Sequence, residues 1–193
     1  MTEIRGEDWY GEDLGAAAYA DVTFTDVDLS EVVTRGATFE RCTFHSCRFN
    51  ASTHVASAFV ACDFRRCNFF DVVLDGCKLT GSVLSECTLR PMAVRGGVWR
   101  SVSLRGANLT GLELDGLDLR EADLSLADLT GTSLRGAQLT GATLRRARLV
   151  GVDLRGATLD GVDLREAVLD GTRLDLVGAV LLAEQHGAIV DPS

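Results

Sequence analysis

The sequence predicts an all-β solenoid, in which the chain winds around one axis and turns a corner every five residues. Three observations predict this fold. A five-residue register runs without a slip from Ile4 to Leu174, which makes 35 central positions, and all but two of them are apolar. The residue two before each centre is usually small, and sixteen of the twenty glycines lie two after a centre. A helix or a flat strand cannot hold this repeat on one face, because their side chains recur every 3.6 and every 2 residues, roughly.

Each repeat is expected to form one side and one corner of a square coil. Glycine two after the centre suits the second central residue of a type II turn, where φ is positive. Four corners close a coil of twenty residues, and residues twenty apart then stack at the strand spacing of about 4.8 Å. The 35 centres therefore predict about nine coils, in a rod roughly 40 Å long at that spacing.

The predicted interior is aromatic in the first half of the chain and aliphatic in the second. One ladder of centres begins with Phe24, Phe44 and Phe64 and continues with leucines to Leu164. Two centres are clearly polar, Thr34 and His54, and they are neighbours in another ladder. We interpret them as a hydrogen-bonded core pair or a locally bulged coil, since buried polar groups normally find partners. The alternative is a buried pH-sensitive site.

All six cysteines occupy the small inward position two before a centre, which explains their spacing without chemistry. There is no CxxC pair, so we expect no zinc and no other metal. Cysteine is a good small core residue, and we expect reduced thiols in a cytoplasmic protein. A disulfide across one coil step remains an alternative on distance alone. The N-terminal segment is acidic and polar, and we identify no signal peptide or membrane-spanning stretch.

The least regular repeats lie in the segment "TLRPMAVRGGVW". Pro91 occupies a corner, while Met92 is large and Gly97 is small for the inward position. Because the two lie at adjacent corners, we expect Gly97 to make room for Met92. We interpret the segment as a kink without a functional role.

After Leu174 the five-residue period ends. The sequence predicts a helix over about residues 176–186, with Asp175 as its N-cap and Gly187 at the C′ position. We therefore divide the chain into a solenoid, residues 1–174, and a C-terminal helix and tail, residues 175–193. One helix face is expected to cap the last coil. The helix is apolar on more than one face, which predicts a homodimer through this end, with a larger intramolecular cap as the alternative. The expected dimerisation residues are Leu176, Val177, Val180 and Leu181.

The repeats "ANLTG", "ADLSL" and "ADLTG" resemble the pattern A(D/N)LxG of the pentapeptide-repeat family, and the resemblance extends over residues 4–174. It implies a right-handed quadrilateral β-helix. Within the family, this chain is most similar to the mycobacterial fluoroquinolone-resistance proteins. The similarity rests on the unbroken rod, the segment "CTLRP" and the helix ending in "HG". That resemblance implies a DNA mimic that binds DNA gyrase, dimerises through its C-terminal ends and protects against quinolones. The Qnr proteins are more distant, because loops interrupt their coils.

The net charge of −9 argues against direct binding of nucleic acid. Residues 1–31 hold nine acids and one arginine, and one face of the rod has six acids against three arginines. The candidate partner-binding acids on this face are Asp8, Asp28, Glu31, Asp71, Asp128 and Asp170. Duplex DNA of about 40 Å carries roughly 24 charges, so mimicry would rest on shape and on selected acidic clusters. Alternatively, the acids only keep the rod soluble.

No nucleophile–base pair or ligand set is apparent around the three histidines, so we expect neither an enzyme nor a cofactor. The leading hypothesis is a cytoplasmic protein that binds and inhibits or modulates DNA gyrase as a DNA mimic. The rival hypothesis is a structural or interaction scaffold with a different protein partner.

Overall fold

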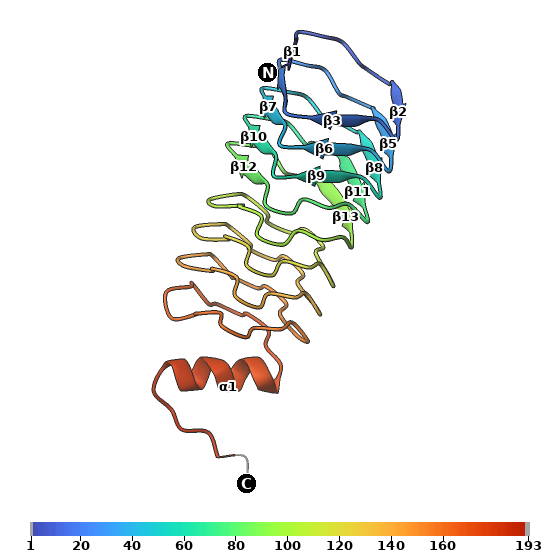
Figure 1. The fold of residues 1–193 in the computed structure, drawn as a ribbon. Helices are drawn as coiled ribbons and strands as arrows, with labels where there is room; N and C mark the ends of the chain where they lie inside the picture. Colours follow the sequence, from blue (N-terminus) through green and yellow to red (C-terminus); the bar gives the residue numbers. More distant parts are fainter. Residues whose placement is uncertain (1, 192–193) are drawn as a thin grey trace.

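The chain forms a four-sided rod with one helix at its C-terminal end (Figure 1). The computed structural model describes residues 2–191. Three sides of the rod carry parallel sheets. On the fourth side, residues twenty apart are joined by isolated parallel bridges such as Asp8↔Asp28 and Asp28↔Arg48. The predicted all-β solenoid is therefore confirmed.

The strands are short, and their partners lie twenty residues away, as in Phe24↔Phe44; the register shifts at Gly15. The first sheet contains β1 (Thr2–Arg5), β4 (Val22–Thr25), β7 (Thr43–His45), β10 (Asp63–Arg65) and β12 (Val83–Ser85). The second contains β2 (Asp13–Gly15), β5 (Val33–Arg35), β8 (Thr53–Val55), β11 (Val72–Asp75) and β13 (Met92–Arg95). The third contains β3 (Ala18–Ala20), β6 (Thr38–Glu40) and β9 (Ala58–Val60).

Regular strands occupy only about the first five turns of the rod, so the prediction of about nine coils of β-helix is corrected. Beyond Val98 the chain continues to coil, but neighbouring coils are joined by single bridges up to Asp153↔Arg173. The corners explain the difference. In the second half each corner is closed by a backbone hydrogen bond, as from Ala107 N–H to the Leu104 carbonyl at 3.0 Å. Such turns leave too little extended chain on each side for a regular strand.

Residues two after a centre adopt positive φ, as the glycine pattern predicts. Gly106 and Gly111 have φ of 67° and 70°. The same conformation occurs at residues with side chains, including Glu31 at 57°, Asp71 at 61° and Leu126 at 62°. The left-handed region costs an ordinary residue roughly 1–2 kcal/mol. The stacking of neighbouring coils must therefore hold these residues in place.

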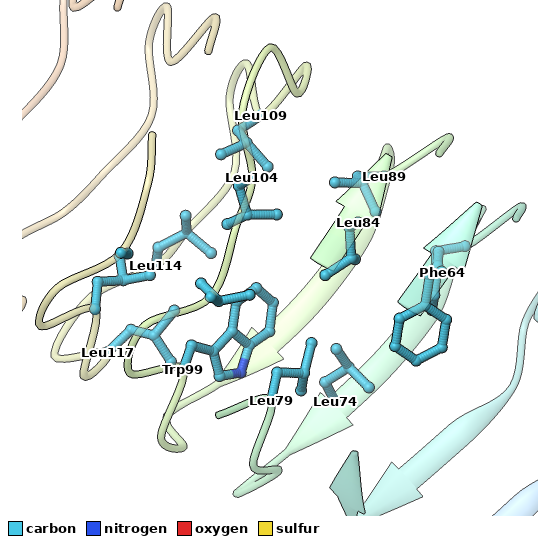
Figure 2. Close-up of a cluster of buried hydrophobic side chains, with 14 of the residues drawn as sticks. Phe64, Leu74, Leu79, Leu84, Leu89, Trp99, Leu104, Leu109, Leu114 and Leu117 are labelled. Atoms are coloured by element: carbon cyan, nitrogen blue, oxygen red, sulfur yellow. The ribbon is translucent and has the colours of Figure 1, made fainter. Parts of the chain in front are cut away.

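The interior has the predicted change from aromatic to aliphatic side chains. Phe24 and Phe44 stack with ring centroids 4.7 Å apart and planes 4° apart, and Phe64 continues the stack at 4.7 Å. Further along the rod, Trp99 lies among leucines of neighbouring coils, including Leu79 and Leu104 (Figure 2). Each coil therefore buries its apolar side chains mainly against the coils above and below it, as in other solenoids.

Thr34 and His54 form a hydrogen-bonded pair in the core, so the first interpretation is confirmed. Thr34 Oγ1 lies 2.8 Å from His54 Nδ1 and 2.8 Å from Ser57 Oγ. On the other side of the ring, His54 Nε2 lies 3.0 Å from Ser52 Oγ. β5 and β8 pair in register here, without a bulge. Complete burial lowers the pKa of His54 to about 4, so the ring is neutral near pH 7.

The six cysteines are free thiols and line the interior, as expected from their position. Their thiols lie within hydrogen-bond distance of carbonyl groups in the preceding coil, as between Cys62 Sγ and the Phe39 oxygen at 3.3 Å. Ser82 has the same role, and its hydroxyl donates to the Phe59 carbonyl at 2.7 Å. The inward position therefore suits small side chains that donate to a backbone carbonyl.

Gly97 meets a backbone constraint that the sequence analysis did not identify. Its φ is 115°, and a Cβ at this position would lie 2.3 Å from the carbonyl oxygen of Cys77. The close approach of the Cys77 backbone in the preceding coil explains why a glycine is needed here.

The helix α1 (Leu176–Gln185) follows the last repeat. Asp175 is its N-cap and accepts from the Gly178 amide at 2.9 Å, as predicted, and Gly187 has the expected positive φ of 88°. Leu181 and Leu182 are partly buried against the core, so one face of the helix covers the end of the rod.

Gln185 gives the last coil a substitute for the next strand. Its side-chain amide donates to the Val162 carbonyl at 2.6 Å, and its side-chain oxygen accepts from the Leu164 amide at 2.9 Å. These are the backbone groups that a further coil would bind. The helix therefore satisfies part of the open edge as well as covering the core.

Candidate protein-interaction surface

The six candidate acids do not form one cluster. Asp8 and Asp28 are neighbours through a bridge between the first two coils, and Glu31 follows at the adjoining corner. The remaining three lie in later, separate coils. Asp71 is at a corner, Asp128 precedes a centre, and Asp170 follows one. The structure therefore brings together three candidate acids at the N-terminal end and spreads the others along the rod.

Three of these acids have a structural role that the sequence analysis did not identify. Asp8, Asp28 and Asp128 each precede a centre, and each side chain accepts from the backbone amide two residues later, at 3.0 Å. This bond holds the chain as it leaves the centre, because Asp and Asn side chains readily accept from backbone amides two residues ahead. The Asp and Asn of the repeat are thus partly explained by backbone geometry.

Ion pairs neutralise part of the predicted acidic face. Arg48 lies 2.7 Å from Asp28, whose side chain is 18% exposed, and this bond helps lower the pKa of Asp28 to about 2. Arg148 lies 3.6 Å from Asp128, whose pKa is lowered chiefly by the hydrogen bond from Thr130 and also by this arginine. Both arginines stand twenty residues after the acid that they pair with.

Pairs twenty positions apart recur elsewhere, between Arg41 and Asp21 at 2.8 Å and, with the arginine first in the sequence, between Arg66 and Glu86 at 2.8 Å. An acid and an arginine twenty positions apart in the sequence would have indicated these pairs in advance. The pairs decide which acids keep an uncompensated charge.

Five acids of the first two coils are exposed and make no salt bridge within residues 2–191, although five other acids there do. We call them the N-terminal acidic end; they are Glu7, Asp8, Glu12, Asp26 and Glu31. Glu31 also accepts from the Tyr10 hydroxyl at 2.7 Å, which raises the pKa of Tyr10. Asp71 and Asp170 are likewise exposed and outside the salt bridges of the described chain.

The C-terminal end carries a different surface. Leu176 and Val177 are 79% and 76% exposed, whereas Val180 is half-buried and Leu181 packs on the core. Beside the helix lies an open apolar hollow of about 470 Å³. Its lining residues are Leu169, Leu174, Ala179, Leu182, Ala183 and His186. The end of the rod therefore exposes apolar side chains that the helix does not cover.

Other kinds of site find little support in the described chain. Residues 2–191 contain no group of three or more His, Cys, Asp or Glu side chains placed to hold a metal ion. None of the helices described is long and apolar enough to cross a bilayer.

Comparison with known proteins gives a family match over more than half of the chain. The model described as pentapeptide repeats (8 copies) matches residues 58–90, 100–136 and 137–175. No curated protein sequence matches significantly.

Several solved structures are similar in fold. HetL of the cyanobacterium Nostoc sp. strain PCC 7120, a pentapeptide repeat protein involved in heterocyst differentiation regulation, is 21% identical. The match covers 88% of this chain and 90% of HetL, with a TM-score of 0.48. A trypsin-treated variant of QnrB1, a plasmid-mediated fluoroquinolone resistance protein, is 20% identical over 98% of each chain, with a TM-score of 0.46. The pentapeptide repeat protein alr5209 of Nostoc PCC 7120 is 44% identical over 40% of this chain and 64% of its own, with a TM-score of 0.40.

Proposed function

We propose that this chain, which belongs to the pentapeptide-repeat family, binds DNA gyrase as a surrogate for duplex DNA, modulates its activity and protects it from fluoroquinolones. In this proposal the protein acts in the cytoplasm and makes no direct contact with nucleic acid. The proposal starts from the resemblance to the mycobacterial fluoroquinolone-resistance proteins and is supported by the shape and charge of the rod.

The observation that carries the proposal is the N-terminal acidic end. Its five uncompensated acids lie within two coils, which span about 10 Å at the strand spacing. About 10 Å of duplex DNA carries roughly six phosphate charges. The local charge of this end therefore approaches that of DNA, although the charge of the whole rod does not.

A channel that holds DNA is basic, and it attracts an acidic rod by the same long-range field that attracts phosphates. The other candidate acids extend the contact surface along the rod in this proposal. Asp71 and Asp170 would contribute full charges. Asp28 and Asp128 would contribute less, since each has an arginine beside it.

We further propose that two copies associate through the C-terminal end. Leu176 and Val177 would enter the partner's apolar surface, with Val180 and Leu181 at the edge of the contact. A dimer joined at these ends would place an N-terminal acidic end at each tip of a longer rod. A second copy is a suitable occupant because the exposed surface is apolar and lies at the end of the rod, where joining does not obstruct the acidic ends.

The proposal is tested by measuring gyrase supercoiling, drug-stabilised cleavage and direct binding with two matched variants. The first replaces the acids of the N-terminal acidic end: Glu7→Gln, Asp8→Asn, Glu12→Gln, Asp26→Asn and Glu31→Gln. Asparagine at position 8 can still accept from the backbone, so the fold is expected to persist. The control replaces five other acids without salt bridges in residues 2–191: Asp75→Asn, Glu113→Gln, Glu121→Gln, Asp123→Asn and Asp160→Asn. Both variants lose five negative charges.

We expect the first variant to lose gyrase binding and the control to retain it. Binding of the unmodified protein should weaken with salt, because exposed charges are screened beyond about 8 Å at physiological ionic strength, and it should be competed by DNA. If the unmodified protein leaves gyrase unaffected, the gyrase proposal is wrong and the scaffold hypothesis replaces it. If both variants act equally, recognition through the N-terminal acidic end is wrong.

A further inference from the structure

The ladder of backbone hydrogen bonds is interrupted in the middle of the rod. Between the coils of residues 102–121 and 122–141, the ladder includes Leu114 N–H to Ser133 O at 2.8 Å and Gly116 N–H to Arg135 O at 2.8 Å. One coil earlier, the corresponding amides of Val94 and Gly96 have no backbone acceptor within the described chain. The amide of Glu113, which would bind the Met92 carbonyl, also lacks its partner there.

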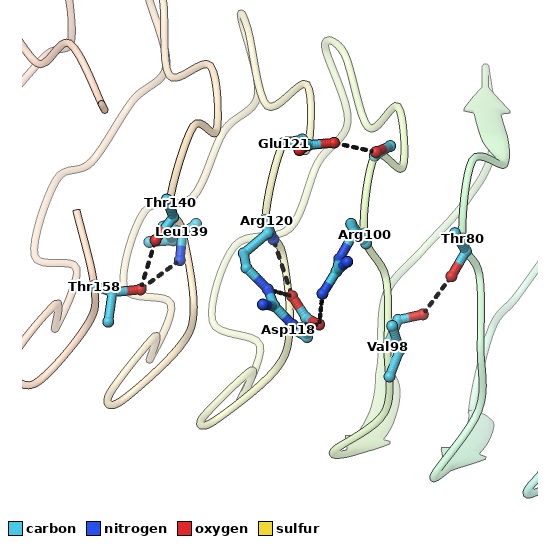
Figure 3. A network of polar contacts seen from close by, with 10 residues as sticks. Thr80, Val98, Arg100, Asp118, Arg120, Glu121, Leu139, Thr140 and Thr158 are labelled. Carbon is cyan, nitrogen blue, oxygen red and sulfur yellow. Dashed lines mark hydrogen bonds and ion pairs between the residues drawn. The ribbon is translucent and has the colours of Figure 1, made fainter. Parts of the chain in front are cut away.

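The interruption affects only two of the four sides. On the first side, Val83 and Ser103 still form a bridge, and the Leu84 amide binds the Ser103 carbonyl at 3.0 Å. On the opposite side of the gap, the Trp99 amide binds the Asp118 carbonyl at 2.8 Å. The Asp118 side chain lies between two arginines (Figure 3), with Arg120 of its own coil at 2.6 Å and Arg100 of the preceding coil at 3.6 Å. The two coils are therefore held by backbone hydrogen bonds along one edge. Along the other edge the backbones are separated, although the Arg90 side chain donates to Asn108 and Thr110 of the next coil.

The separation forms a cleft of about 370 Å³. It is lined by Met92, Ala93, Val94, Arg95, Gly111, Leu112 and Glu113. Val94 is the one centre between Phe24 and Leu164 that is not fully buried, and Met92 beside it is also partly exposed. The cleft therefore opens a part of the apolar interior that every neighbouring coil covers.

One wall of the cleft is a strand edge, and the other is the segment around Glu113, which forms a single bridge with the next coil. β13 forms one wall, and its four residues extend for about 13 Å at the usual rise per residue. A free strand edge presents unpaired amides and carbonyls, so it favours a ligand that supplies both donors and acceptors. Inward-pointing Met92 and Val94 favour apolar groups, whereas outward-pointing Arg95 and Glu113 favour opposite charges.

We propose that this cleft binds an extended peptide segment of a partner protein, which is added as a strand between β13 and the coil of residues 102–121. The segment has about four residues with alternating character. Two apolar side chains point into the rod beside Met92 and Val94. Of the two outward side chains, a basic one lies beside Glu113 and an acidic one beside Arg95. This mode of recognition combines backbone hydrogen bonds with pockets for alternate side chains.

The test uses the peptide acetyl-Val-Lys-Val-Glu-amide and amide hydrogen exchange of the full chain. In the free protein, the Val94, Gly96 and Glu113 amides should exchange faster than those of Leu114 and Gly116, which are hydrogen-bonded in the next coil. At a peptide concentration about ten times its Kd, exchange at Val94, Gly96 and Glu113 should slow about tenfold. The Leu114 and Gly116 amides serve as internal controls. The peptide control has the same side chains with every amide nitrogen methylated, so it cannot donate.

Protection of the three amides by the first peptide but not by the methylated one supports strand addition. Three results would overturn the proposal. First, the Val94, Gly96 and Glu113 amides could be as protected from exchange in the free protein as those of Leu114 and Gly116, which would show that the cleft is closed in solution. The peptide could fail to protect them at millimolar concentration. The methylated peptide could protect them equally, which would indicate an apolar pocket without strand addition.

Discussion

Replacing Gln185 should loosen the last coil without unfolding the rest of the rod. The Gln185 amide occupies the place of the missing next strand, through the bonds to Val162 and Leu164. In Gln185→Leu, the Leu164 amide and the Val162 carbonyl lose these partners and lie against a hydrocarbon side chain.

The expected loss of stability follows from the Leu164 amide and the Val162 carbonyl, which are left without hydrogen-bond partners. A buried donor or acceptor without a partner costs about 1–3 kcal/mol, and these groups are partly buried, so about 1 kcal/mol each is appropriate. The total is about 2 kcal/mol. Because a solenoid is stabilised coil by coil, this loss should appear mainly in the terminal coil. A loss of about 2 kcal/mol corresponds to roughly 30-fold faster exchange of the Leu164 amide, provided exchange occurs through local opening.

The assay is amide hydrogen exchange at Leu164, with Leu124 in the middle of the rod as a reference. Gln185→Glu adds a second readout. Its carboxylate still accepts from the Leu164 amide but repels the Val162 carbonyl, so its folded pKa should be raised. The stability of this variant should therefore fall as pH rises above about 4, the usual pKa of glutamate. Glu184→Gln on the same helix is the control. If exchange at Leu164 in Gln185→Leu changes less than about threefold, the strand-substitute role of Gln185 is wrong.

Three further predictions concern the core and the C-terminal end. His54 has a folded pKa of about 4, below its unfolded value near 6.5, so folding favours its neutral form. The free energy of unfolding should therefore fall by about 3 kcal/mol as pH falls from 6.5 to 4. Chemical denaturation of His54→Leu should not show this loss, and a pH dependence identical to that of the unmodified protein would contradict the prediction. Gly97→Ala should lose about 3 kcal/mol or more in the same assay, because its Cβ meets a backbone oxygen at a φ of 115°; a neutral effect would show that the contact relaxes. Leu176→Lys with Val177→Lys should convert the proposed dimer to a monomer in analytical ultracentrifugation at micromolar concentration, and a full-length protein that already sediments as a monomer would refute the dimer.

The repeat alone predicted much of the fold. The five-residue register determines which residues point inward, and the structure buries the predicted ladder of Phe24, Phe44 and Leu164. The caps of the helix were also predictable, because Asp175 and the positive φ of Gly187 depend on local chemistry. The pairing of Thr34 with His54 followed from their spacing, since side chains twenty apart are neighbours in adjacent coils.

The tertiary structure decided where that regularity fails and which charges remain. Coil stacking pairs Asp13 with Arg35 at 2.7 Å although they lie 22 positions apart, so the twenty-residue spacing alone does not identify every neutralised acid. The opening beside Val94 depends on how two whole coils meet. A local period describes each coil but not the fit between irregular coils. The sequence by itself therefore determined the coil and its inward residues, and the contacts between coils decided the uncompensated acids, the cleft and the end of the rod.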